Sequence, residues 1–348
     1  MSALPFVTAD LPGCGGRVKA SPEDFRVDEV PAYEPSGSGP HLWLHVEKRD
    51  RTTRDVVRDL ARALGVADRD VGHAGLKDRA AVTTQWLSFP VARDPDPRSL
   101  DGPGHRVLAV SRHGNKLRTG HLRGNRFAIR VRGGDPARAL ACAAALRERG
   151  FANFFGPQRF GAAGRNADVG RALLLGHRDA ETARAARDRF LRRLVLSAWQ
   201  ARAFNAWLAE RLRDGLFASA IRGDVLARLD SGGLFVCEEP AVDTPRIARF
   251  ECSPAGPMFG HKLRAAEGEA RGREERLLAA EGVTAADLAR GRGETEGTRR
   301  VARLPVDVLL DPEPDGFLAR FELPRGSYAT VVLGELTKAE VGLDDAGA

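Results

Sequence analysis

The sequence predicts a fold that contains both strands and helices, because strand patterns and helix patterns occupy separate stretches of the chain. Apolar residues alternate with polar ones at 25–30, 42–47 and 127–132, which is typical of strands. Apolar residues recur with helical spacing at 179–214, and a charged helical region follows at 262–290. The 348 residues are enough for two or three domains with buried cores.

Capping residues predict the ends of two further helices. Thr52 or Thr53 is suited to begin a helix that Gly65 ends, because a hydroxyl accepts a bond from a free backbone N–H and glycine tolerates the left-handed conformation. Asp135 begins the second of these helices and Gly150 closes it.

The rest of the chain is expected to form shorter elements. Short strands and turns are expected at 215–260, and a loop at 291–298. A strand is expected at 317–323, followed by a last helix that Ser327 caps, with Tyr328 in its first turn.

Composition narrows the class of partner and compartment. The formal net charge is +7 and the isoelectric point is about 9.7, which favours an anionic partner such as nucleic acid. The four cysteines have no short paired spacing, so neither a zinc site nor a disulfide framework is expected. The sequence shows no signal peptide and no apolar run of membrane-spanning length. We therefore expect a cytoplasmic protein without a membrane partner.

The stretch 72–88 carries the strongest candidate for chemistry. Glycines punctuate a loop that leads to Asp78, and a strand rich in Thr, Val and Trp follows. Lys77 and Arg79 flank Asp78, and neighbouring cations favour an ionised carboxylate. An ionised carboxylate at such a junction suits a nucleophile or a base, although a surface turn held by an ion pair has the same pattern.

The segment 102–132 is strongly basic. It contains no Asp or Glu and eight Lys or Arg residues: Arg106, Arg112, Lys116, Arg118, Arg123, Arg126, Arg130 and Arg132. Such a density of cations suits a run of phosphates, and a merely solvated face usually mixes the two signs of charge. A solvated basic edge strand is the alternative. Its histidines lack the spacing of metal ligands, so no metal is expected.

Five motifs together resemble the tRNA pseudouridine synthase D (TruD) family along nearly the whole chain. They are KASPEDF at 19–25, GLKDRAAVTTQW at 75–86, RHGNKLRTGHLRGNRF at 112–127, NFFGPQRFG at 153–161 and LPRGSYAT at 323–330. The motifs occur in the order of the family and at similar distances.

This resemblance implies an isomerase of tRNA uridine. The base at position 13, with the glutamate tRNA as the expected substrate, would be detached from its sugar, rotated and rejoined through carbon. No cofactor, metal or obligatory protein partner is implied. Asp78 matches the family's catalytic aspartate.

The resemblance also implies the residues that contact the substrate. Aromatic faces stack a flipped base and an amide reads its edge. The matching positions are Phe25, Asn125 and Tyr328, with Lys19 expected to pair with Asp78 and Phe127 to pack below the base. The family usually has Phe where this chain has Tyr328. Judged without the family, Phe25 has the pattern of a core residue. Phosphate contacts are expected from Arg112, Lys116, Arg118 and Arg123.

The family implies the architecture as well. Residues 1–152 and 305–348 would form a pseudouridine synthase domain of the α+β class, with a mostly antiparallel mixed sheet and helices. Residues 153–304 would form an inserted α/β family-specific (TRUD) domain, which gives a V-shaped molecule.

Two other functions are compatible with parts of the pattern. A non-catalytic RNA-binding or RNA-chaperone protein would use the same basic cleft, but it would not need Asp78. A zinc deaminase would need an H-x-E…P-C-x-x-C arrangement, which the sequence lacks.

Overall fold

The computed structural model describes residues 4–161, 164–291 and 293–339. The chain forms two compact units. The sheet unit consists mainly of Pro12–Ala144 and Val306–Ala329, and the helical unit mainly of Ala145–Pro305.

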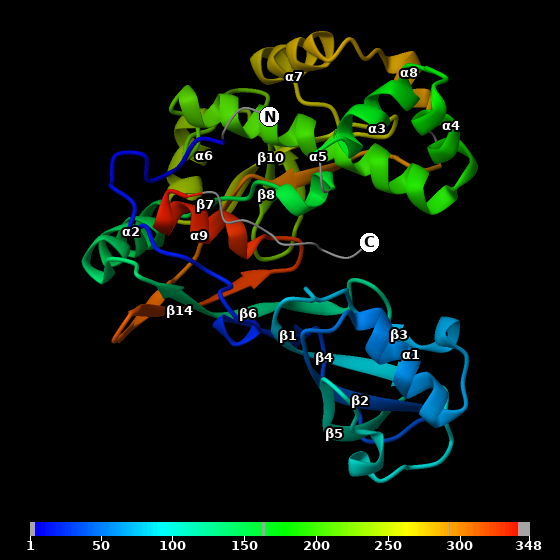
Figure 1. The fold of residues 1–348 in the computed structure, drawn as a ribbon. Coiled ribbons are helices and arrows are strands. Elements are labelled where there is room, and N and C mark those ends of the chain that lie inside the picture. The colour runs from blue at the N-terminus through cyan, green and yellow to red at the C-terminus, as the bar shows by residue number, and fades with distance from the viewer. Residues whose placement is uncertain (1–3, 162–163, 292, 340–348) are drawn as a thin grey trace. The chain divides into compact units, whose positions relative to one another are not determined.

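The sheet unit is built on one large sheet (Figure 1). Its strands are β1 (Phe25–Pro31), β2 (His41–Arg49), β3 (Gly72–His73), β4 (Val82–Phe89), β5 (His105–His113), β6 (Leu122–Arg132), β13 (Leu309–Glu313) and β14 (Gly316–Pro324). The order is β13-β14-β6-β1-β4-β2-β5, with β3 paired to β4. Among these described strands only β1 and β4 pair in parallel. The predicted α+β class and mostly antiparallel mixed sheet are therefore confirmed.

Helix α1 (Thr53–Leu64) covers one face of this sheet (Figure 1). Thr52 accepts the backbone N–H of Asp55, and Gly65 ends the helix with a φ of 72°, as the sequence predicts. Val56 and Leu60 pack in one apolar cluster with residues of β2 and β4, so the helix anchors the strands on which the site is built.

The helical unit has its own strands and helices. The helices are α3 (Asn166–Leu174), α4 (Ala180–Arg187), α5 (Arg189–Arg213), α6 (Pro240–Ala248), α7 (Gly268–Ala280) and α8 (Ala285–Arg290). Strands β8 (Val225–Arg228), β9 (Leu234–Val236), β10 (Cys252–Met258) and β11 (Thr298–Val301) form a sheet in the order β11-β10-β8-β9. Buried Trp199 and Ala203 of α5 pack with Phe259, directly after β10, in one apolar cluster.

Strands β7 (Phe151–Ala152) and β12 (Arg303–Leu304) pair with each other. Ala152 lies opposite Arg303, so the two ends of the intervening segment are side by side. An inserted domain needs such neighbouring ends, but the proposed boundaries 153–304 stay a prediction. Helices α2 (Pro136–Arg149) and α9 (Ala329–Thr337) complete the described helices.

Three predicted elements need correction. The single helix expected over 179–214 is two helices, because the Asp188 carboxylate accepts the backbone N–H groups of Phe190 and Leu191 and so starts α5 anew. Phe190 is consequently 65% exposed, although the helical spacing placed it on the apolar face. The region expected to hold only short strands and turns also contains α6, and α9 begins at Ala329, one residue after Tyr328.

Candidate active site

Asp78 lies in the loop between β3 and β4, and the backbone of this loop is held from several sides. The Lys77 N–H donates to Thr53 Oγ1 at 3.0 Å, and Gln85 Nε2 donates to the Gly75 carbonyl at 3.4 Å. The Lys48 ammonium donates to the Asp78 carbonyl. The loop is thus tied to α1, β2 and β4 while the Asp78 side chain stays 40% exposed, which suits a carboxylate that must meet a substrate.

The carboxylate of Asp78 faces the ammonium of Lys19, with Nζ 3.5 Å from Oδ2. This confirms the pairing that the sequence predicts. The Lys19 side chain is only 7% exposed, and its Nζ lies 4.2 Å from the centroid of the Phe25 ring. The backbone of Lys19 has a φ of 58°, a left-handed conformation that costs a lysine free energy and that often occurs at functional sites.

The cations beside Asp78 in the sequence point elsewhere. The Lys77 ammonium lies 2.8 Å from Glu29 Oε2, and Arg79 faces Asp50 at 3.7 Å. The sequence predicts that Lys77 and Arg79 stabilise the charge of Asp78. In the structure, the cations at Asp78 are instead Lys19 and Lys48.

Lys48 is a site residue that the sequence reasoning missed. It is 2% exposed, and burial lowers the pKa of its ammonium to about 8, with the nearby charge of Asp78 opposing the shift. A signal was present: Leu42, Leu44, Val46 and Lys48 share one face of β2, so this lysine continues a buried apolar row.

The aromatic residues of the site form a buried group. Phe127 lies opposite Val27 on one side and Phe321 on the other. Its ring stacks on the ring of Phe321, with the two centroids 5.3 Å apart. It packs against the ring of Phe25 in a T-shaped arrangement, with a centroid distance of 6.4 Å. Phe25 is 2% and Phe127 9% exposed, so both belong to the core beneath Lys19. Their contact with a base stays a prediction.

Asn125 and Tyr328 come from distant parts of the chain. Asn125 is half-buried on β6, directly opposite Glu29 of β1 and Leu323 of β14. The chain leaves β14 after Pro324, turns with the Ser327 N–H bonded to the Pro324 carbonyl, and reaches half-buried Tyr328. The pairing of β14 with β6 therefore brings parts of the chain that are about 200 positions apart side by side within the sheet.

The four residues expected to contact phosphates differ in exposure and in the number of bonds they make within the protein. Arg112 is 14% exposed and bonds to Asp94 and to the carbonyls of the preceding loop. Lys116 donates to the Arg69 carbonyl at 3.0 Å. Arg118 is exposed, and Arg123 is 68% exposed with its nearest acid at 3.7 Å.

Acids from other parts of the sheet unit compensate much of the charge of 102–132. Ion pairs join Arg106 to Glu47, Arg126 to Glu322, Arg130 to Glu313 and Asp24, and Arg132 to Asp24. The Arg130 and Arg132 guanidinium groups hold the pKa of the Asp24 carboxyl below its usual range, against the effect of burial, with Arg132 the larger cause. The sheet thus pairs charges that are far apart in the sequence, and the segment is less free for RNA than its composition indicates.

A second group of cations lies in and beside α4 and at the start of α5. Its members are exposed, and none has an ion pair among the described residues: Arg178, Arg184, Arg187, Arg189 and Arg193. The nearby acids Asp179 and Asp188 serve as helix caps, and Glu181 pairs with Arg165 at 3.4 Å. Residues 145–305 contain 28 Lys or Arg and 21 Asp or Glu. The difference of seven positive charges equals the formal net charge of the full chain, +7.

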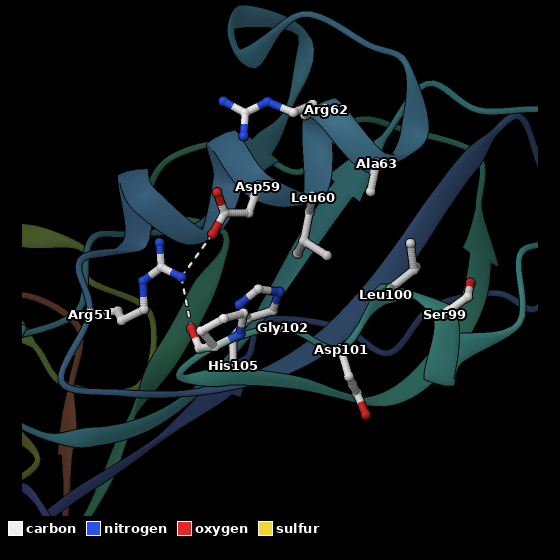
Figure 2. Close-up of a pocket in the computed structure, with 11 residues that line it drawn as sticks. Arg51, Asp59, Leu60, Arg62, Ala63, Ser99, Leu100, Asp101, Gly102 and His105 are labelled. Carbon is white, nitrogen blue, oxygen red and sulfur yellow. Dashed lines mark hydrogen bonds and ion pairs between the residues drawn. The ribbon is translucent and has the colours of Figure 1, made fainter.

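A separate hollow of about 350 Å³ lies beside α1 and contains none of the predicted site residues (Figure 2). Arg51 lines the hollow and is bonded to Asp59 and to the Pro103 carbonyl at 2.8 Å each. His105 lines the hollow and is 8% exposed. Because Arg51 and Asp59 already pair with each other and no predicted site residue lines the hollow, it is not the candidate site.

Within the described ranges, no group of three or more His, Cys, Asp or Glu side chains is arranged to hold a metal ion. All four cysteines are buried thiols outside any disulfide. No described helix is both long and apolar enough to span a bilayer.

Known proteins resemble this chain over nearly its full length. The family model described as tRNA pseudouridine synthase D (TruD) matches residues 4–186 and 171–336. A protein named tRNA pseudouridine synthase D from Anaeromyxobacter dehalogenans (strain 2CP-C) is 70% identical over 345 residues, covering 99% of each chain. One of the same name from Thermus thermophilus is 41% identical over 340 residues, covering 97% of this chain and 92% of that protein.

A solved structure shares the fold. It is described as a tRNA pseudouridine synthase D (TruD) from Methanosarcina mazei, and it matches with a TM-score of 0.75 at 24% identity over 95% of both chains.

Proposed function

Because the chain belongs to the tRNA pseudouridine synthase D family, we propose that it isomerises uridine to pseudouridine in tRNA. The observation that carries the proposal is the setting of Asp78, whose backbone is anchored while its carboxylate is 40% exposed beside Lys19. A binding protein without chemistry has no need of this arrangement.

The reaction moves one bond and needs no oxidant. The bond from N1 of uracil to C1′ of ribose breaks, the base turns, and a bond from C5 to C1′ forms. C5 loses its proton and N1 gains one, so the composition is unchanged. Asp78 acts as the nucleophile that begins cleavage, and Lys19 holds the carboxylate in place.

Residues around Asp78 bind the flipped base. Asn125 reads its edge, Tyr328 offers a ring for stacking, and buried Phe25 and Phe127 support Lys19 and the neighbouring strands from below.

Both units contribute cations that bind the RNA. Lys116, Arg118 and Arg123 contact phosphates, whereas Arg112 must first exchange its internal bonds. Residues 153–304 hold the tRNA body. This is supported by the arginines of α4 and α5 that have no ion pair within the described part of the chain. The target is the uridine at position 13, with glutamate tRNA as the first substrate to test, in the cytoplasm.

The test is to map pseudouridine in tRNA from cells with and without this protein, and then to treat unmodified tRNA with purified enzyme. A loss of pseudouridine confined to position 13 is expected in cells that lack the protein. If purified protein binds tRNA but no uridine is converted at saturating enzyme, the non-catalytic RNA-binding function replaces this proposal.

A further inference from the structure

A buried lysine connects the candidate active site to the strand that carries Asn125. The Lys77 Nζ lies 2.8 Å from Glu29 Oε2 and 2.7 Å from Asn125 Oδ1. The side chains of Lys77 and Glu29 are 6% and 1% exposed. Glu29 and Asn125 are direct neighbours across β1 and β6, so the ammonium bridges one cross-strand pair.

Both ends of this bridge are fixed. Glu29 Oε1 accepts the backbone N–H of Trp86 in β4, and the backbone N–H of Lys77 donates to Thr53 Oγ1. Thr53 Oγ1 in turn donates to Gln85 Oε1 at 2.8 Å. The ammonium therefore has little freedom to move away from Asn125.

The chemistry of lysine decides how the Asn125 amide is turned. An ammonium has three donors and no acceptor, so the amide atom that it meets must be the oxygen. The NH₂ group of Asn125 then lies on the opposite side of the amide and faces away from Lys77. An asparagine without such a partner could turn either group towards a ligand.

We propose that Lys77 is a positioning residue that makes Asn125 a hydrogen-bond donor, and that this selects uracil over cytosine at the target. The proposal rests on the proposed function, in which Asn125 reads the edge of the flipped base. Uracil presents the O4 carbonyl where cytosine presents the N4 amino group, so an NH₂ donor matches the first and opposes the second. Two donors that face each other in a closed site both lose their partners.

A purely structural role for Lys77 makes a different prediction. Removal of the Lys77–Glu29 ion pair would then lower stability and would weaken binding of both bases equally. The ratio of affinities for the two bases therefore separates the two roles.

The experiment uses full-length protein that carries Asp78→Asn, so that binding is measured without turnover. The probes are two unmodified tRNAs that differ only by U or C at the target position. We expect the U form to bind about 10-fold to 100-fold more tightly, in line with the discrimination of one good base contact. Adding Lys77→Met should bring this ratio close to one. Adding Arg79→Met, the matched control, should leave the ratio unchanged, because Arg79 is exposed and faces Asp50.

A second variant tests the donor itself. Asn125→Asp keeps an oxygen against the Lys77 ammonium but replaces the NH₂ donor with an acceptor. The preference should then shift towards the C form, whose amino group donates. This variant retains the bridge to Glu29, so the test does not depend on whether Lys77→Met folds.

An unchanged ratio in folded Lys77→Met, or an undiminished preference for U in Asn125→Asp, overturns the inference. The protein without any of these substitutions is assayed for pseudouridine formation in parallel. If the unsubstituted protein forms no pseudouridine, the proposed function is wrong. The ratio of affinities for the U and C forms tests the role of Lys77 independently of that result.

Discussion

Asp78 is positioned through its backbone, while its carboxylate meets one buried cation. The Lys48 ammonium and the Thr53 hydroxyl hold the loop at Asp78 and Lys77, and Lys19 faces the carboxylate from a left-handed backbone conformation. Each of these contacts joins residues that are at least 24 positions apart, so the site forms only when the sheet and α1 are assembled.

Replacing Asp78 with Asn should abolish turnover and leave tRNA affinity largely intact, because the amide keeps the shape but is no nucleophile. We expect a loss of at least about 1,000-fold in kcat, the order found when a nucleophile is removed. The measurement is pseudouridine formation on unmodified tRNA at saturating enzyme. The control is Asp50→Asn, which alters an exposed acid that faces Arg79. Turnover of Asp78→Asn near the unsubstituted rate excludes Asp78 as the nucleophile.

Lys48 should make stability depend on pH in the alkaline range. Burial lowers its pKa from 10.5 to about 8 in the folded state, so between these values the unfolded chain binds the extra proton. Between these pH values, the free energy of unfolding of the unsubstituted protein should therefore rise with pH relative to that of Lys48→Met. Below pH 7, the difference between the two free energies should stay constant.

The measurement is urea unfolding of both proteins at neutral pH and at about pH 9.5. Lys262→Met, which removes an exposed lysine paired with Glu296, is the matched control. If the difference between Lys48→Met and the unsubstituted protein stays constant over the range, the ammonium is not desolvated as the structure has it.

At the scale of elements, the sheet decides which cations are available. The β5–β6 segment contains no acid of its own, yet β2, β13 and β14 supply partners for many of its arginines. Arg118 is exposed in the connection between the two strands, and Arg123 is 3.7 Å from Glu322.

The double variant Arg118→Gln/Arg123→Gln should weaken binding to RNAs of any sequence. The slope of log affinity against log salt should fall by about 0.7–0.9 for each phosphate contact that is lost. The control Arg106→Gln/Arg126→Gln removes one arginine of β5 and one of β6, which pair with Glu47 and Glu322. Equal slopes in the two double variants would show that the exposed pair does not meet RNA.

At the scale of the whole molecule, chemistry and net charge lie in different units. All residues that face or support Asp78 belong to the sheet unit, whereas residues 145–305 account for an excess of seven positive charges. This separation is the reason for the proposal that residues 153–304 hold the tRNA body.

Replacing Arg187 and Arg189 with Gln should therefore weaken binding of whole tRNA more than binding of a short RNA that carries only the target uridine. A loss of about two phosphate contacts should lower the salt slope for whole tRNA by about 1.5. The matched control is Arg249→Gln/Arg271→Gln in the same unit, because both arginines are exposed but pair with Glu251 and Glu275. Equal losses for the two RNAs would argue against a role in holding the tRNA body.

Local physics explains how much of this protein the sequence predicts. The sequence determined the elements that depend on interactions within a few residues: the cap of Thr52, the left-handed Gly65 and the alternation along β1 and β6. The five motifs also pointed to the family and to Asp78. The break at Asp188 was a local signal too, but it was outweighed by apolar spacing on both sides.

Only the tertiary structure decided which charges meet. Lys77 and Arg79 adjoin Asp78 in sequence. The pairing of β1 with β6 nevertheless places Glu29 and Asn125 side by side, and the Lys77 ammonium contacts both. Lys19 and Lys48 reach Asp78 because β1 and β2 both adjoin β4 in the sheet. Ion pairs depend on distances of a few ångströms between residues far apart in the chain, and no local pattern records those distances.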